Sequence, residues 1–305
     1  MAQLSKEKFK IIGCENANAD EILRPSITYW QDAWRRLKQN KLATASLVVL
    51  ILITIMTIFG QYINGFSFET TNNNLINAKP SMQHWFGTDT IGRDIFSRVW
   101  AGGRVSIEIG LIGTFIVTIV GSIYGGISGF YGGFVDDIMM RIVEILGSIP
   151  WLVIVILVSL IFEKGMFAII VAMSVTGWVG MARLVRGQLL QIKEQEYVLA
   201  AAALGANPSR IIAKHLLPNT LGIMIVSITF AIPGFIFGEA FLSFLGQGIQ
   251  SPKTSWGALA AAAQPNLMFY PYQLFFPSLF ISLTLLSFML LGDGLRDALD
   301  PRLRQ

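Results

Sequence analysis

Two acidic residues, Glu144 and Glu239, lie in largely apolar stretches of this chain and are the first candidates for chemistry. An ionised carboxylate at membrane depth is costly, so such a residue usually faces the inside of a helix bundle or a water-filled path. For Glu239 we favour a hydrogen bond between helices, and we keep direct contact with a solute as the alternative. Both residues are therefore candidates for lining a translocation path.

Patterns for catalysis and for nucleotide binding are absent from the sequence. His84 and His215 are its only histidines, and no His-Glu-x-x-His pair is present, which excludes a zinc protease of that kind. The phosphate-binding loop Gly-x-x-x-x-Gly-Lys-Ser/Thr is also missing. We expect no catalytic residue, no metal and no cofactor on this chain, and no nucleic-acid partner. If ATP and Mg²⁺ drive a process here, another subunit must hold them.

The composition is that of an integral membrane protein. Of the 305 residues, 53% are hydrophobic and 14% are charged, whereas a soluble domain carries about 25% charged residues. Six apolar stretches are candidates for membrane spans, at residues 42–62, 105–131, 138–162, 167–181, 220–245 and 275–291. The third begins in an amphipathic piece and the fifth contains Pro233 as a bend. The sequence predicts an all-α membrane protein with six transmembrane helices.

The basic residues predict which way the chain crosses the membrane. If both termini are cytoplasmic, about 17 of the 23 Lys and Arg lie on cytoplasmic segments, as the positive-inside rule requires. Residues 1–41 and 296–305 are then cytoplasmic tails around a core at 105–295. Residues 63–104 and 246–274 are then outer loops.

Several charged residues are spaced so that they could pair on a helix. Pairs four residues apart stabilise a helix when their charges are opposite. The expected pairs are Asp89 with Arg93, Asp94 with Arg98, and Arg104 with Glu108. After the second span, we expect Asp136 and Asp137 to start a helix in which Arg141 lies one turn beyond Asp137.

The polar segment between the fourth and fifth spans is expected to form two short helices on the cytoplasmic side. Residues 197–204 are Ala-rich and favour a helix, and Gly205 is placed for a left-handed cap. Asn207 and Pro208 suit the N-cap and first turn of a second helix, which Pro218 should end or bend. Small side chains here would let another protein approach the backbone. An amphipathic helix lying on the bilayer is the alternative.

Glycines recur every four residues at the end of the second span, at Gly121, Gly125, Gly129 and Gly133. This spacing places them on one helix face and allows another helix to approach closely in lipid. We favour packing within the bundle over a groove for a solute.

The cytoplasmic segment, 184–219, resembles the coupling loop of ABC-transporter permeases, with Ala200, Ala201, Gly205, Leu217 and Pro218 in register. Other stretches resemble the dipeptide, oligopeptide and nickel branch of that family, and its second permease subunit in particular. They are HWFGTDTIGRDIFSR at 84–98, FLSFLGQG at 241–248, SWG at 255–257 and GDGLRDALDPR at 292–302. The resemblance extends over nearly the whole chain from Trp34 onwards, with these stretches in the right order.

This resemblance implies a type I ABC importer permease bundle with a cytoplasmic coupling helix, in the cytoplasmic membrane of a bacterium. A homologous permease, two cytoplasmic ATPases and an outer solute-binding protein are the implied partners, besides membrane lipid. The residues expected to couple to the ATPases are Tyr197, Ala200, Ala201, Gly205, Asn207, Leu217 and Pro218. The implied solute is an oligopeptide or dipeptide. Nickel or another small solute, and a stand-alone channel or carrier, remain alternatives.

The resemblance also assigns a role to the outer loop at 246–274, whose only charge is Lys253. The loop should contact the binding protein or cap the outer mouth of the path. Its Trp256 and Tyr270 equally suit a loop resting on the membrane surface.

Overall fold

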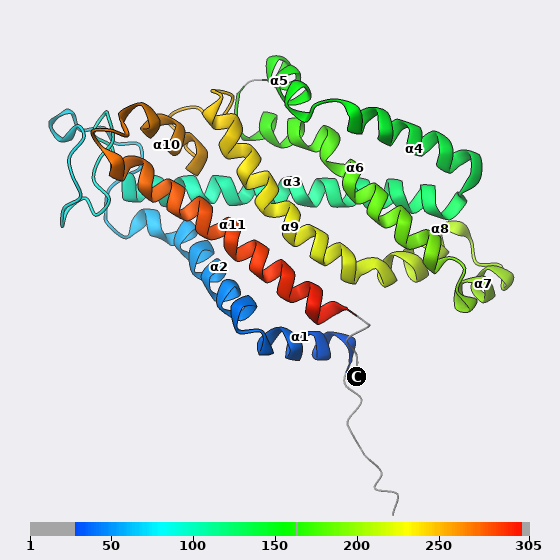
Figure 1. The fold of residues 1–305 in the computed structure, drawn as a ribbon. Helices are drawn as coiled ribbons and strands as arrows, with labels where there is room; N and C mark the ends of the chain where they lie inside the picture. Colours follow the sequence, from blue (N-terminus) through cyan, green and yellow to red (C-terminus); the bar gives the residue numbers. More distant parts are fainter. Residues whose placement is uncertain (1–27, 163, 301–305) are drawn as a thin grey trace, which may run out of the picture.

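The computed structural model describes residues 28–162 and 164–300, and its regular elements there are helices (Figure 1). The α-helices are α1 Tyr29–Gln39, α2 Lys41–Phe59, α3 Ile95–Tyr131, α4 Gly133–Ser148, α5 Trp151–Ile161, α6 Met166–Ile192, α7 Glu196–Ala203, α8 Pro208–Ile211, α9 Leu217–Phe244, α10 Trp256–Ala263 and α11 Pro271–Leu299. The predicted tails lie mostly outside the described residues, at 1–27 and 301–305.

Five helical segments of the described chain are long and apolar enough to cross a membrane: Lys41–Tyr62, Ile95–Tyr131, Met166–Ile192, Pro208–Phe244 and Pro271–Leu299. Helices α4 and α5 meet that test only as a pair, and they are bent by 83° at the break between them. Ile149, at the break, has an extended backbone with φ −78° and ψ 128°, as expected for a residue before proline. The predicted third span is therefore a broken one.

Helix α3 is the centre of the bundle. It packs along α6 and α9, and also contacts α2, while α11 packs against both α2 and α9 (Figure 1). The short helix α10 lies at the end of the bundle where α3 begins, and α7 lies at the opposite end. We refer to these as the α10 end and the α7 end.

Two boundaries differ from the sequence prediction. Helix α3 begins at Ile95 and not at Val105, because Asp94 caps it and its first turns are buried against aromatic side chains of α11. The fifth span begins at Pro208, since α8 continues into α9 through a wider π-type turn at Ile212–Leu216. Pro218 lies in the first turn of α9, where its missing N–H does not end the helix.

Candidate functional site

The turn between α7 and α8 has the capping chemistry predicted for it. Gly205 has φ +83°, and its N–H donates to the carbonyl of Ala202 at 3.0 Å. The next N–H, of Ala206, donates to the carbonyl of Ala201 at 3.1 Å. These two bonds form a Schellman motif, which ends a helix through a left-handed residue.

Helix α8 is capped on its other side. The Asn207 side chain accepts from the backbone N–H of Arg210 at 2.8 Å, and Pro208 follows in the first turn. With both caps in place, the direction of the chain between α7 and α8 is fixed by local bonds.

The inner side of this helix pair is anchored in the bundle. Val198 of α7 and Ile211 of α8 are buried in one cluster with Leu189 of α6 and Met224 of α9. Leu216 of the π-type turn belongs to the same cluster and is fully buried. Burial of several aliphatic side chains in contact with two spans makes α7 and α8 a firm extension of those spans.

The outer side of the pair carries five of the predicted coupling residues, and the other two, Leu217 and Pro218, lie in the first turn of α9. Tyr197, Ala200, Gly205, Asn207 and Pro218 are exposed, and Ala201 and Leu217 are half-buried. Two further apolar side chains, Leu199 and Leu204, are 57% and 89% exposed. Sequence reasoning did not select these leucines as contact residues. Helical spacing could have identified them. If Val198 faces the bundle, Leu199 and Leu204 lie about 100° and 240° around the helix axis from Val198 and so face away from the bundle.

Three of the four predicted glycines form a seam between α3 and α6. A Cβ atom at Gly125 would collide with the carbonyl of Ala182, and one at Gly129 would lie 2.9 Å from the Cβ of Leu189. Gly121 is equally close to α6. Gly133 does not belong to the seam, because α3 ends at Tyr131 and Gly133 begins α4 with open space around it.

Where α3 meets α4, an ion pair reaches across to α6. Arg186 contacts both carboxylate oxygens of Asp136 at 2.5 Å, and Ser128 of α3 also donates to Asp136. Arg141 pairs with Glu144 at 3.0 Å. Asp136 lies in the first turn of α4 as predicted, and it is held there by Arg186 of α6.

Glu144 lines a polar hollow of about 680 Å³ between α4 and α6. Its side chain is 58% exposed, and the arginines Arg183 and Arg186 line the same hollow. This exposure places Glu144 on an open face of the described chain and not inside the bundle.

Glu239 is fully buried and joins three helices. Its carboxylate accepts from Ser106 of α3 at 3.0 Å, from Ser243 of α9 at 2.7 Å, and from Ser255, the N-cap of α10, at 2.6 Å. The Ser106 hydroxyl in turn accepts from the backbone N–H of Trp256 at 3.1 Å. This geometry matches the hydrogen bond between helices that we favoured over solute contact. We call Glu239 with these three serines the Glu239 node.

Trp256 is also buried in the bundle. Its side chain has no exposed surface, and its indole N–H donates to the carbonyl of Val99 at 2.8 Å. Of the two roles kept open for the outer loop, resting on the membrane surface through Trp256 does not agree with this burial. It fills the space over Gly103 of α3, where a Cβ atom would touch the indole ring.

Two of the three expected charge pairs near the start of α3 are present. Asp89 pairs with Arg93 at 2.7 Å, and Arg104 pairs with Glu108 at 2.9 Å. Asp94 instead contacts the ring of His84 at 2.8 Å. The expected Asp94–Arg98 pair is absent because the loop before α3 folds back over the helix start. Arg98 reaches Asp89 at 3.6 Å.

Comparisons with known proteins agree with this architecture. The family described as binding-protein-dependent transport system inner membrane component matches residues 118–305. The N-terminal TM domain of oligopeptide transport permease C matches residues 28–80. The chain belongs to the family of binding-protein-dependent transport inner membrane components. It is accordingly a multi-pass membrane permease, and membership of this family counts against the alternative of a stand-alone channel or carrier.

Several relatives extend over almost the whole chain. The chain is 50% identical over 304 residues to a dipeptide transport system permease protein of Bacillus subtilis (strain 168), covering 99% of this chain and 95% of that one. It is 48% identical to an oligopeptide transport system permease protein of the same organism, with 100% of both chains covered. An oligopeptide transport system permease protein of Escherichia coli (strain K12) is 43% identical, with 90% of this chain and 91% of that one covered.

A solved structure shares the fold. It is described as inward facing conformations of the MetNI methionine ABC transporter, and it matches with a TM-score of 0.53 at 20% identity. The match covers 67% of this chain and 94% of the other. The prediction of an all-α type I ABC importer permease fold is confirmed.

Proposed function

We propose that this chain is one of two permease subunits of an ATP-driven importer that moves short peptides into a bacterial cytoplasm. Relatives that cover most of the chain are described as dipeptide, oligopeptide and glutathione transport system permeases, and these descriptions favour a peptide over nickel. A homologous permease completes the path, and an outer solute-binding protein delivers the peptide. Two ATPases bind ATP and Mg²⁺, and this chain supplies no catalytic residue.

In this proposal the α7 end faces the cytoplasm, together with both termini. Basic residues gather on the helices that reach this end, at Arg183, Arg186, Lys193, Arg210 and Lys214, as expected for a cytoplasmic segment. The α10 end then faces the outside, where the binding protein docks.

The observation that carries the proposal is the construction of the α7–α8 pair. One side is buried against α6 and α9, while the other presents Leu204, 89% exposed, beside small alanines. An exposed apolar patch on a firm support marks a surface for another protein. We assign it to the ATPase, whose closure would push on α7 and so rearrange the spans as rigid bodies.

The substitution Ala201→Glu tests this assignment. A charged side chain on the docking surface should prevent close approach of the ATPase, so peptide uptake and co-purification of the ATPase should both fall by at least tenfold while membrane insertion is normal. The matched control is Ala262→Glu, which makes the same change at an exposed position of α10 and should retain the ATPase. Normal uptake by the Ala201→Glu transporter would contradict the docking assignment.

A further inference from the structure

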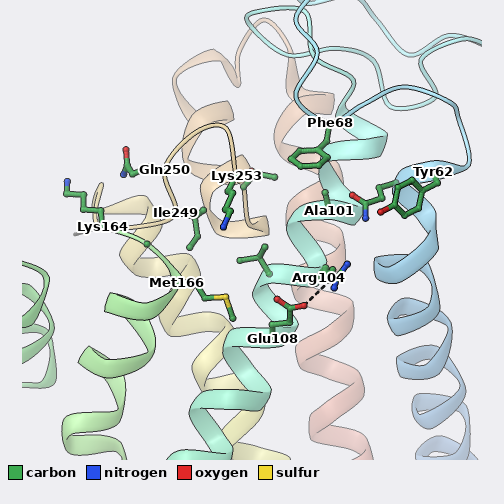
Figure 2. A pocket seen from close by; sticks show the side chains of 14 residues that line it. Tyr62, Phe68, Ala101, Arg104, Glu108, Lys164, Met166, Ile249, Gln250 and Lys253 are labelled. Atoms are coloured by element: carbon green, nitrogen blue, oxygen red, sulfur yellow. Dashed lines mark hydrogen bonds and ion pairs between the residues drawn. The ribbon is translucent and has the colours of Figure 1, made fainter. Parts of the chain in front are cut away.

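A cavity of about 540 Å³ opens at the α10 end of the bundle (Figure 2). It lies between the first turns of α3, the start of α6, the residues after α2 and the loop that follows α9. This volume is within the range of sites for small ligands. The cavity is far from the α7–α8 pair and does not include the Glu239 node.

Charged side chains of both signs line this cavity. Arg104 and Glu108 lie one turn apart on α3, and the Arg104 Nε donates to a Glu108 oxygen at 2.9 Å. Lys164 donates to the carbonyl of Gly246 at 2.8 Å. Figure 2 shows Lys253 reaching from the loop into the space above Met166.

Much of the bonding capacity of these groups is unused. Lys253 makes no hydrogen bond or ion pair with any residue that the structure describes. A lysine ammonium has three donors, so Lys164 retains two beyond its bond to Gly246. The second carboxylate oxygen of Glu108 also has no partner among the described residues. The cavity thus offers donors to an anion and an acceptor to a cation.

A short peptide has the charges that fit this arrangement. Its terminal carboxylate and terminal ammonium are the two charges that every unmodified peptide carries, whatever its sequence. Lys253 would bind the first by charge-assisted hydrogen bonds and Glu108 would bind the second. The apolar lining, including Met166 and Ile249, can accept varied side chains without selecting among them. An anionic lipid headgroup would leave the second oxygen of Glu108 without a cationic partner, whereas the ammonium of a peptide supplies one.

We propose that this cavity is an outer subsite for the charged ends of a short peptide, in which Lys253 faces the carboxylate and Glu108 faces the ammonium. The inference rests on the proposed function, because it requires peptides to reach the α10 end. It adds that the permease itself recognises free termini.

The test is uptake by the complete transporter in proteoliposomes, using one peptide with a free C-terminus and the same peptide as its C-terminal amide. The uptake ratio of acid to amide should fall by about fivefold in Lys253→Gln, the size of an exposed charge pair. Any preference of the binding protein is the same for every permease variant and cancels in this comparison. Lys253→Arg, which keeps the charge, should retain the wild-type ratio.

Two further variants test the ammonium side of the subsite and provide a control. Glu108→Gln should reduce, by a similar factor, the preference for a free N-terminus over an N-acetylated one. Lys79→Gln changes an exposed lysine outside the cavity and should leave both ratios unchanged.

The outcomes separate the subsite from the proposed function. Wild-type proteoliposomes that import no peptide would overturn the proposed function and the subsite with it. Normal import with an unchanged ratio in Lys253→Gln would overturn the subsite alone. An equal loss for acid and amide that depends on anionic lipid in the liposomes would assign the cavity to lipid headgroups and also overturn it.

Discussion

Gly125 shows how a single missing side chain sets the distance between the two most closely packed helices, α3 and α6. Because a Cβ atom there would collide with the carbonyl of Ala182, Gly125→Ala should destabilise the bundle by about 1–3 kcal/mol. The measurement is the thermal unfolding midpoint of the detergent-solubilised protein. Gly180→Ala is the control, since Gly180 lies on α6 with nothing within 4 Å of the added atom. An equal unfolding midpoint for Gly125→Ala and wild type would show that α3 and α6 can move apart to accept a methyl group without loss of stability.

Glu239 stabilises the bundle through hydrogen bonds, because its carboxylate is buried and accepts from three serines. Glu239→Ala would leave these hydroxyls without their acceptor, and each unsatisfied buried group costs about 1–3 kcal/mol. Since Ser255 caps α10, we expect faster hydrogen exchange of α10 amides as well as a lower unfolding midpoint. Glu69→Ala, on an exposed part of the outer loop, should change neither. Unaltered exchange in α10 would mean that the node does not hold this helix.

At the scale of elements, the α7–α8 turn depends on one left-handed residue. Gly205 has φ +83°, and this conformation costs a residue with a Cβ atom about 1–2 kcal/mol of conformational free energy. Gly205→Ala should therefore increase hydrogen exchange in α7 while the spans stay protected. Gly187→Ala, on α6 with open space around it, should leave α7 unchanged. If exchange in α7 were the same in both variants, the cap would not be what orders this turn.

This turn could be predicted from sequence because its determinants are local. Gly205 and Asn207 carry their cap geometry within a few residues, so their types and spacing are sufficient evidence. The long spans were equally visible as apolar runs. In contrast, the burial of Trp256 depends on the space above Gly103, far away in the chain. The pairing of Asp94 with His84 likewise depends on how a loop closes, which helix spacing cannot reveal.

The break between α4 and α5 could be predicted only in part from the sequence. Pro150 was visible in the sequence and disfavours helix at Ile149. The 83° angle between the two helices depends on how each packs against α6, which the apolar pattern of residues 138–162 does not encode. A continuous third span was therefore predicted where the structure has a bent pair.

At the scale of the whole molecule, one helical segment connects the two ends of the bundle. It runs without interruption from Pro208, beside the coupling turn, to Phe244, just beyond the Glu239 node. With 37 residues, it is about 55 Å long. Pro233 lies inside this segment without ending it, so a push on α7 can reach the α10 end through one continuous helical segment, provided that α8 keeps its orientation relative to α9.

The π-type turn at Ile212–Leu216 sets that orientation, because it contains one residue more than an α-helical turn would. This turn accommodates its extra residue locally, so one more alanine added after Leu216 has no turn to absorb it and should rotate α7 by about 100° around the axis of α9. Leu199 and Leu204 would then face a different direction. We expect the insertion variant to enter the membrane normally but to lose ATPase co-purification and peptide uptake.

A compensating deletion distinguishes this rotation from simple damage. Removing Ala213, which is exposed, from the insertion variant restores the number of residues between α8 and α9, so the direction of α7, ATPase binding and uptake should recover substantially. Ala213→Ser keeps the length and should behave as wild type. If the insertion variant bound the ATPase normally, or if the deletion failed to rescue it, the orientation of α7 would not be set by this turn. The continuous helical connection from α8 to the Glu239 node would then lose its role in coupling.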